Sequence, residues 1–240
     1  MSHQIFSTKG MGLIGSLMLC ATAALAESEQ GVVVELFTSQ GCSSCPPADA
    51  LMAKLAQTPG VIGLALHVDY WDYIGWTDTF GQASFSERQK AYAHAAGEKM
   101  IYTPQMIVAG GARVAGNQPS EVAAALAAVK PSPVTLVLSR QGSDLLISAS
   151  SAQALANPVI VQLVHYADRA EVAIERGENS GLNVVYNNIV TSWQKVGDWT
   201  GVAPLQLVTA AGEGPVVVIL QTRAPDGVGP AQIVAAARLK

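Results

Sequence analysis

The sequence predicts an α/β domain followed by an all-β, sandwich-like domain. Near the N-terminus, a buried strand, a helix and a second buried strand follow one another as a βαβ unit, which is typical of parallel sheets. After the Pro-rich segment 131–133, apolar residues recur with a period of two and helical patterns nearly vanish. We therefore expect an α/β domain at residues 27–130 and a β-rich domain at residues 134–240.

The composition is that of a folded globular protein. Of the 240 residues, 50% are hydrophobic and 13% are charged, which excludes disorder as the main state. The formal net charge is −4, and no cluster of Lys or Arg is present that could follow a phosphate backbone, so we expect no nucleic-acid partner. Three cysteines are too few for a disulfide scaffold, so a cysteine that matters here acts by reactivity or metal ligation.

Residues 1–26 predict a secretory signal peptide that is cleaved after Ala26. The competing interpretation is a membrane anchor, but the apolar run 11–25 is interrupted by glycines and polar residues and is shorter than the roughly 20 residues that span a bilayer. A lipoprotein would be acylated at Cys20, yet the bulky Leu19 precedes it. We therefore expect a periplasmic or secreted protein without a membrane anchor.

The elements of the first part follow in order. Residues 32–37 form a β-branched, apolar run that predicts a buried strand, and residues 38–41 form a turn. Pro46 and Pro47 suit the first turn of a helix, whose apolar residues recur at helical spacing until 58–60 end it. The further elements are a strand at 61–68, an aromatic and acidic loop or lid at 69–79, a helix that begins near 85 and stops at 97, a strand at 105–109 and a helix at 119–129.

In the second part, alternating apolar residues predict short strands at the spacing of an all-β domain. The strand candidates are 134–138, 145–150, 159–166, 171–175, 184–193, 205–208, 216–222 and 233–238.

Cys42 and Cys45 are the two cysteines left after cleavage, and they form a single C-x-x-C. At the start of a helix, free backbone N–H groups and the helix dipole stabilise a thiolate, and we expect Cys42 to occupy that place. Cys45 follows one turn later, about 5–6 Å away, close enough to attack a mixed disulfide on Cys42. The spacing thus predicts a nucleophile and a resolving thiol, and Ser43 and Ser44 between them can hydrogen bond to a sulfur.

Other uses of a C-x-x-C fit less well. Haem attachment requires His directly after the second Cys, where Pro46 stands, and a structural zinc site requires further ligands. His67, His94 and His165 are the candidates for such ligands, and for each we favour a structural or surface role. We therefore expect no cofactor and no metal.

Two further candidates accompany the cysteines. Pro104 after Thr103 precedes a strand, where a cis peptide would leave the Thr103 backbone free to pair with a bound peptide; a trans proline at an edge strand is the alternative. Glu35 lies in an otherwise apolar strand, where a desolvated carboxylate can accept a proton from a thiol, or else points to solvent at the end of that strand.

Several segments together resemble a large bacterial family of secreted thioredoxin-like proteins that is catalogued as a domain of unknown function. The matching segments are 33–49, 67–72, 102–106, 176–179 and 186–188. The resemblance implies a thioredoxin-like fold for residues 27–130, with Cys42 as the exposed nucleophile, Cys45 as the resolving thiol and Pro104 as a cis-proline facing them after Thr103. Glu35 resembles the buried acid of thioredoxins loosely, because it precedes Cys42 by seven residues.

The departures from that family pattern limit what the resemblance implies. Ser43-Ser44 stands where reducing thioredoxins have Gly-Pro, so oxidant, reductant and isomerase stay open. The acidic loop with Trp71 and Asp72 forms either a lid over Cys42 or interdomain packing. A polar set in the second part either caps the redox face or satisfies local turns, and we favour the latter. This set is Arg176, Glu178, Asn179 and Asn188.

The leading hypothesis is an exported thiol–disulfide oxidoreductase acting on exported proteins or small thiols. One alternative is a soft-metal protein that holds copper with the same dithiol. Another is a non-catalytic binding protein in which Cys42 and Cys45 form a permanent disulfide.

Overall fold

The computed structural model describes residues 1, 3, 28–225, 227 and 229–240. Apart from residues 1 and 3, the predicted signal peptide, with Cys20 in it, lies outside the described residues. The helices of the described part are α1 (Pro46–Leu55), η1 (Asp72–Ile74, a 3-10 helix), α2 (Ala83–Ala95) and α3 (Pro119–Ala127). None of these helices is long and apolar enough to cross a membrane.

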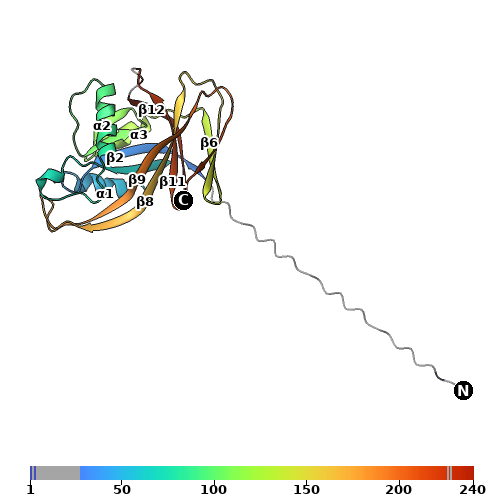
Figure 1. The fold of residues 1–240 in the computed structure, drawn as a ribbon, viewed down its shortest axis with the longest axis horizontal. Helices are drawn as coiled ribbons and strands as arrows, with labels where there is room; N and C mark the ends of the chain where they lie inside the picture. The colour runs from blue at the N-terminus through green and yellow to red at the C-terminus, as the bar shows by residue number, and fades with distance from the viewer. Residues whose placement is uncertain (2, 4–27, 226, 228) are drawn as a thin grey trace.

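Twelve strands in the described residues form two sheets (Figure 1). The large, curled sheet has nine strands in the order β1-β12-β11-β8-β9-β3-β2-β4-β5, and the small sheet has the order β10-β7-β6. The strands are β1 (Glu29–Gln30), β2 (Val32–Thr38), β3 (Val61–His67), β4 (Gln105–Val108), β5 (Ala112–Ala115), β6 (Val134–Gln141), β7 (Asp144–Ser151), β8 (Val159–Ala173), β9 (Asn183–Trp199), β10 (Leu205–Ala210), β11 (Val216–Arg223) and β12 (Pro230–Leu239).

The predicted fold class is wrong, because the chain is not an α/β thioredoxin-like domain followed by an all-β domain. β9, from the second half of the chain, pairs in parallel with β3 at Ala65 and Ile189, and the sheet continues through β8, β11 and β12. The two strands expected at 159–166 and 171–175 are one strand, β8, of 15 residues. Local periodicity predicts strands well but does not indicate which strands pair, so it missed this shared sheet.

The helices cover the two faces of the sheet in its N-terminal part. On one face, α1 and α3 pack against β2, β3 and β4 through an apolar cluster. On the other face, α2 packs through Phe85 and Tyr92 against side chains of β2, β3, β8 and β11. Alternate residues of β2 therefore face different helices: Leu36 faces α1, whereas Phe37 lies in the cluster with α2.

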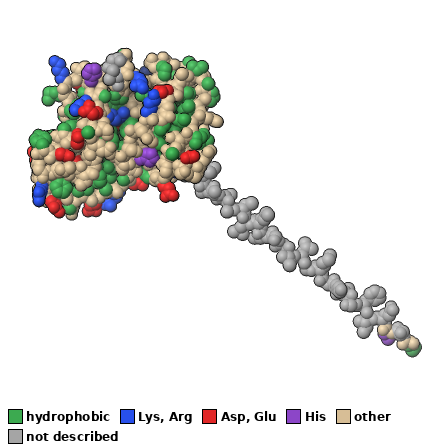
Figure 2. Space-filling model, in the orientation of Figure 1, with side chains coloured by type: hydrophobic (Ala, Val, Ile, Leu, Met, Phe, Trp, Pro, Cys, Tyr) green, Lys and Arg blue, Asp and Glu red, His purple; other side chains and the backbone are tan. Residues whose placement is uncertain are grey.

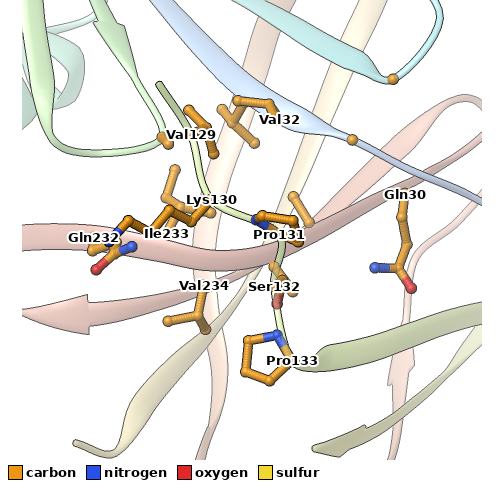
Figure 3. A pocket seen from close by; sticks show the side chains of 16 residues that line it. Gln30, Val32, Val129, Lys130, Pro131, Ser132, Pro133, Gln232, Ile233 and Val234 are labelled. Atoms are coloured by element: carbon orange, nitrogen blue, oxygen red, sulfur yellow. The ribbon is translucent and has the colours of Figure 1, made fainter. Parts of the chain in front are cut away.

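The small sheet packs against the far part of the large sheet. Leu136, Leu138 and Ile147 of β6 and β7 share an apolar cluster with residues of β8, β11 and β12. Where residues 129–133 cross from α3 to β6, a hollow of ≈ 370 Å³ lies beside Val32 and Ile233 and has mostly apolar walls (Figure 3). Figure 2 shows Lys and Arg side chains interspersed with Asp and Glu on the visible face.

Candidate functional site

The C-x-x-C residues form a disulfide that closes immediately before α1. Cys42 and Cys45 are bonded, with their Cα atoms 5.4 Å apart. Cys45, rather than Cys42, is the N-cap of α1, and Pro46 and Pro47 open the helix as expected. Cys42 lies in the preceding turn, and its carbonyl accepts a 3.1 Å hydrogen bond from the Cys45 N–H. Cys42 therefore lies three residues before the N-cap and not at the start of the helix, where the sequence analysis expected it.

The disulfide is covered almost completely. Cys42 is 1% exposed and Cys45 is 0% exposed. The loop between β3 and α2 packs on the residue before Cys42: a Cβ placed on Gly41 would lie 3.2 Å from the Trp71 Cβ and 3.3 Å from the Ile74 Cδ1. Trp71 and its neighbours thus lie against the disulfide loop, the place that the sequence suggested for a lid.

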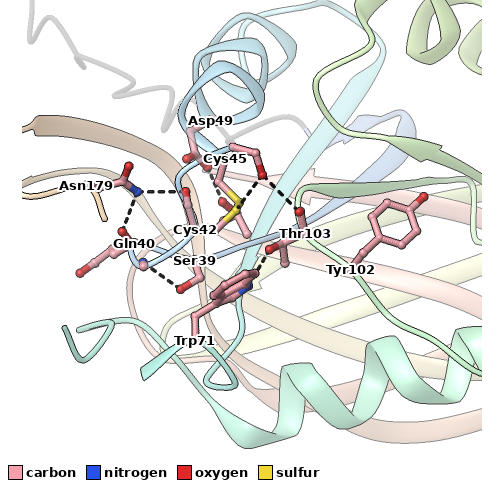
Figure 4. Close-up of a disulfide and its surroundings, with 12 residues drawn as sticks. Ser39, Gln40, Cys42, Cys45, Asp49, Trp71, Tyr102, Thr103 and Asn179 are labelled. Carbon is pink, nitrogen blue, oxygen red and sulfur yellow. Dashed lines mark hydrogen bonds between the residues drawn. A yellow bond between two sulfur atoms is a disulfide. The ribbon is translucent and has the colours of Figure 1, made fainter. Parts of the chain in front are cut away.

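Thr103 and Pro104 lie on another side of the disulfide. The peptide bond between them is cis, which confirms the expectation for this proline. The Trp71 indole Nε1 donates a 2.7 Å hydrogen bond to the Thr103 Oγ1, and the Ser44 hydroxyl donates a 3.5 Å bond to the Thr103 carbonyl. The same hydroxyl lies 3.4 Å from the Cys42 Sγ. The structure therefore brings Cys42, Cys45 and Thr103 together (Figure 4), and Pro104 follows Thr103 directly in the chain.

The tip of the β8–β9 hairpin holds the backbone of the disulfide loop. The Asn179 Nδ2 donates 2.9 Å hydrogen bonds to the carbonyls of Gln40 and Cys42 (Figure 4). Of the polar set in the second part, Asn179 is the member that meets the disulfide loop; Asn188 instead donates to the Gly63 carbonyl, at 2.8 Å. Capping of the redox face was the less favoured of the two alternatives for this polar set, and the contact of Asn179 joins residues 137 positions apart.

Glu35 is fully buried, but its carboxylate faces α2. Arg88 donates to both carboxylate oxygens, at 2.6 and 2.9 Å, and the Tyr92 hydroxyl donates at 2.6 Å. Both partners belong to α2, on the face of the sheet opposite to α1. The structure therefore does not bring Glu35 to the disulfide, and its position gives it a structural ion pair with Arg88.

A different buried acid, Asp49, lies one turn behind Cys45 on α1 (Figure 4). Its Oδ1 accepts a 2.8 Å hydrogen bond from the Thr38 hydroxyl, whereas its Oδ2 has no partner. Burial raises the pKa of Asp49 to about 7. Sequence reasoning missed this residue, although an acid four positions after a cysteine, among the apolar residues of the same helix, was a usable signal.

A second buried titratable pair lies nearby. The His67 Nδ1 is 2.7 Å from the Asp78 Oδ2, and both side chains are fully buried. Asp78 also accepts hydrogen bonds from the backbone N–H groups of Gln40 and Phe80, both at 2.8 Å. It therefore links the end of β3 to the backbone that leads into Cys42.

For metal binding, the described residues contain no group of three or more His, Cys, Asp or Glu side chains arranged to hold an ion. Met52, the methionine of α1, is buried, and its sulfur packs so closely on β3 that a Cβ on Gly63 would lie 2.5 Å from it.

A hollow of ≈ 580 Å³ adjoins the site between α1 and the start of β9. Pro46, Asp49 and Lys54 contribute to one wall, and Leu182 and Asn187 to the other. This hollow brings solvent close to the helix turn that follows the disulfide.

A match to a protein family model establishes the family of the chain. The family described as "Protein of unknown function (DUF1223)" matches residues 33–221. The chain belongs to the DUF1223 family. This confirms the resemblance to a family of unknown function, while the match itself carries no placement in the thioredoxin superfamily.

Solved structures show that the DUF1223 protein shares its fold with two other proteins. It is 34% identical to protein AGR_C_4864 from Agrobacterium tumefaciens, known from a crystal structure, with a TM-score of 0.77 over 87% of this chain and 93% of that chain. HBP35 of Porphyromonas gingivalis is 12% identical, with a TM-score of 0.56 over 88% of this chain and 74% of that chain, a likeness of fold alone. No curated protein matches the sequence.

Proposed function

We propose that this DUF1223 protein is an exported thiol–disulfide oxidoreductase that reacts through Cys42 and Cys45. The observation that carries the proposal is the buried carboxyl of Asp49, one helical turn behind the disulfide. Because its pKa is raised to about 7, this group can exchange a proton at neutral pH with a sulfur that changes between disulfide and thiol. A disulfide closing so short a loop adds little stability by chain entropy, which favours a chemical role over a structural one.

The reduction of the disulfide by a dithiol would proceed in two exchanges. A substrate thiolate attacks the Cys42 Sγ, the Cys42–Cys45 bond breaks, and its electron pair goes to the Cys45 Sγ, which takes the proton of Asp49. The second substrate thiolate then attacks the substrate sulfur of the mixed disulfide, and Cys42 leaves as a thiolate that takes a proton from solvent. Once Asp49 has regained a proton from solvent, the protein has gained two electrons and two protons, and the substrate dithiol has been oxidised to a disulfide; the reverse sequence reduces a substrate disulfide.

The burial of the disulfide limits the class of substrate that can reach it. With Cys42 1% exposed beneath the Trp71 loop, attack requires either a small thiol or a protein thiol that displaces the loop. Export is inferred from the sequence of residues 1–26, and it would place the protein where exported proteins and small thiols are the substrates at hand.

The experiment that tests the proposal is the redox equilibrium of the mature protein with glutathione, in metal-free buffer. We expect a potential of roughly −120 to −270 mV, the range of enzymatic dithiols. In parallel, Cys45→Ser should trap a mixed disulfide on Cys42, and Cys42→Ser should trap none. A potential below about −300 mV would instead identify a permanent structural disulfide and contradict the proposal.

A further inference from the structure

Two buried polar atoms near the disulfide have no hydrogen-bond partner. They are the Asp49 Oδ2 and the His67 Nε2, on side chains that belong to residues 3% and 0% exposed. Buried polar atoms without partners are uncommon in folded proteins, and each calls for an explanation. The proposed exchange reaction uses Asp49 but gives no role to His67.

The sheet register puts both side chains on the same face. Thr38 and His67 are register partners in the parallel pair β2–β3, and such partners point to the same side of a sheet. The Thr38 hydroxyl reaches Asp49 on α1, so His67 also faces α1. The centroid of the Tyr186 ring of β9 lies 4.8 Å from the centroid of the His67 ring, in an edge-to-face contact.

The partners of Asp78 determine which nitrogen of His67 carries the proton. Asp78 accepts hydrogen bonds on both oxygens from the N–H groups of Gln40 and Phe80, so it acts as a carboxylate, and the His67 Nδ1 must donate to it. In the neutral ring, the Nε2 then carries a lone pair. That lone pair is an acceptor, and the protonated carboxyl of Asp49 is a donor, so the two unpartnered atoms are complementary.

We propose that Asp49 and His67 form a coupled pair that holds one proton behind the disulfide, with His67 oriented by Asp78. This inference rests on the proposed function. His67 is a positioning residue: it sets how tightly Asp49 keeps the proton that passes to the Cys45 thiolate when the disulfide is reduced. The pair is then one proton short, and it regains that proton from solvent through the hollow beside Pro46 and Lys54.

The charges around Asp49 define the expected pH dependence. The ionisable groups that interact electrostatically with Asp49 are His67 of β3, Asp78 of the loop after β3 and Tyr186 of β9, and the disulfide precedes Asp49 at the start of its own helix. Positive charge on His67 favours the Asp49 carboxylate, whereas the carboxylate of Asp78 opposes it.

The first test is carbon-13 NMR of the Asp49 carboxyl in the oxidised, full mature protein as a function of pH. His67→Asn keeps a donor at the position of the Nδ1, facing Asp78, and removes the Nε2. We expect the midpoint of the Asp49 titration to shift in His67→Asn, because the Nε2 is lost, and to stay in place in the control His165→Asn, a half-buried histidine of β8 that hydrogen bonds to Ser192. An Asp49 midpoint that is the same in His67→Asn and in the unaltered protein overturns the inference.

A second measurement covers the case in which His67→Asn does not fold. In nitrogen-15 NMR, the His67 Nε2 signal of the unaltered protein should shift with pH at the Asp49 midpoint, and this shift should vanish in Asp49→Asn. Identical Nε2 signals in both proteins would overturn the coupled pair. A redox potential below the enzymatic range would contradict the oxidoreductase proposal. If the Asp49 and His67 signals still shift as expected, the Asp49–His67 coupling holds independently of that proposal.

Discussion

At the scale of single residues, the carboxyl of Asp49 is an ionisable group near the disulfide that is buried with one oxygen unpartnered. Only its Oδ1 accepts a hydrogen bond, from Thr38, and no basic side chain donates to it. In the folded state the neutral form is therefore favoured, whereas in the unfolded chain water solvates the ionised form. The difference makes the stability of the fold depend on pH through this one group.

The sign of that dependence follows from the pKa values. The pKa of Asp49 is about 7 in the folded protein, against 3.8 for an ordinary Asp, so the folded state binds the extra proton between pH 4 and pH 7. Stability should fall across this window as pH rises, and Asp49→Asn should remove the fall, stabilising the protein at pH 8 by about 4 kcal/mol at most. Urea unfolding at a series of pH values measures this.

The control for this prediction is Asp168→Asn, because Asp168 is an exposed acid on β8. Its substitution should leave the pH dependence of stability unchanged. If Asp49→Asn unfolds with the same pH profile as the unaltered protein, the carboxyl is already ionised at neutral pH, and its role as a proton donor fails.

At the scale of elements, the site is the meeting point of four segments: the loop before α1, the loop that carries Trp71, the cis-proline loop and the β8–β9 hairpin. The Trp71 loop packs on Gly41 in the loop before α1. The Trp76 indole also donates a 2.8 Å hydrogen bond to the Gln40 side chain of that loop. Because Gly41 lacks a side chain, the loop can lie directly on the backbone beside Cys42.

Gly41→Ala should loosen this cover. The added methyl would lie 3.2 Å from the Trp71 Cβ, so the loop must move outward by a few tenths of an ångström. Overpacking of this kind costs roughly 1–3 kcal/mol, and a loss of about 1 kcal/mol in loop docking corresponds to roughly a fivefold larger open population. We expect dithiothreitol to reduce the disulfide faster by about that factor.

The matched control is Gly111→Ala, at a glycine with open space around it and no left-handed backbone. Its reduction rate should equal that of the unaltered protein. An unchanged rate in Gly41→Ala would mean that thiols reach Cys42 without movement of the Trp71 loop.

Sequence patterns predicted what is local in this site and missed what is not. The strand, the prolines at the helix start and the C-x-x-C lie within a few residues of one another, and periodicity or spacing is sufficient to find them. Its place before a strand left cis and trans open for Pro104, and the family resemblance led to the expectation of a cis-proline. The contact of Asn179 and the orientation of Glu35 depend on strand pairing over long distances in the sequence, which no local pattern encodes.

At the scale of the whole molecule, a buried polar network joins the two halves of the chain. Arg88 of α2 binds Glu35 of β2, donates a 3.1 Å hydrogen bond to the Gln221 side chain of β11, and stacks on the Trp193 ring of β9, with the guanidinium carbon 3.7 Å from the ring centroid. Both halves of the chain also contribute strands to the large sheet. Unfolding one half alone would therefore break this network and expose the sheet, which raises its free energy.

We therefore expect calorimetry of the mature protein to show a single cooperative unfolding transition. Arg88→Met should lower its stability by about 3–5 kcal/mol, because Glu35 is left buried without a counter-charge. The control Lys90→Met, which breaks an exposed ion pair with Glu87 on the same helix, should leave stability nearly unchanged, because water screens this pair. Two separate transitions in the unaltered protein would contradict a single folding unit.

The hydrogen bond from Asn179 to the Cys42 carbonyl has a consequence for the order of events during synthesis. Cys42 leaves the ribosome 137 residues before Asn179, the side chain that later clamps its loop. Contacts between such distant residues form late in folding. Until that contact forms, the disulfide loop lacks its Asn179 clamp, so the thiols of Cys42 and Cys45 are more accessible during folding than the disulfide is in the folded protein.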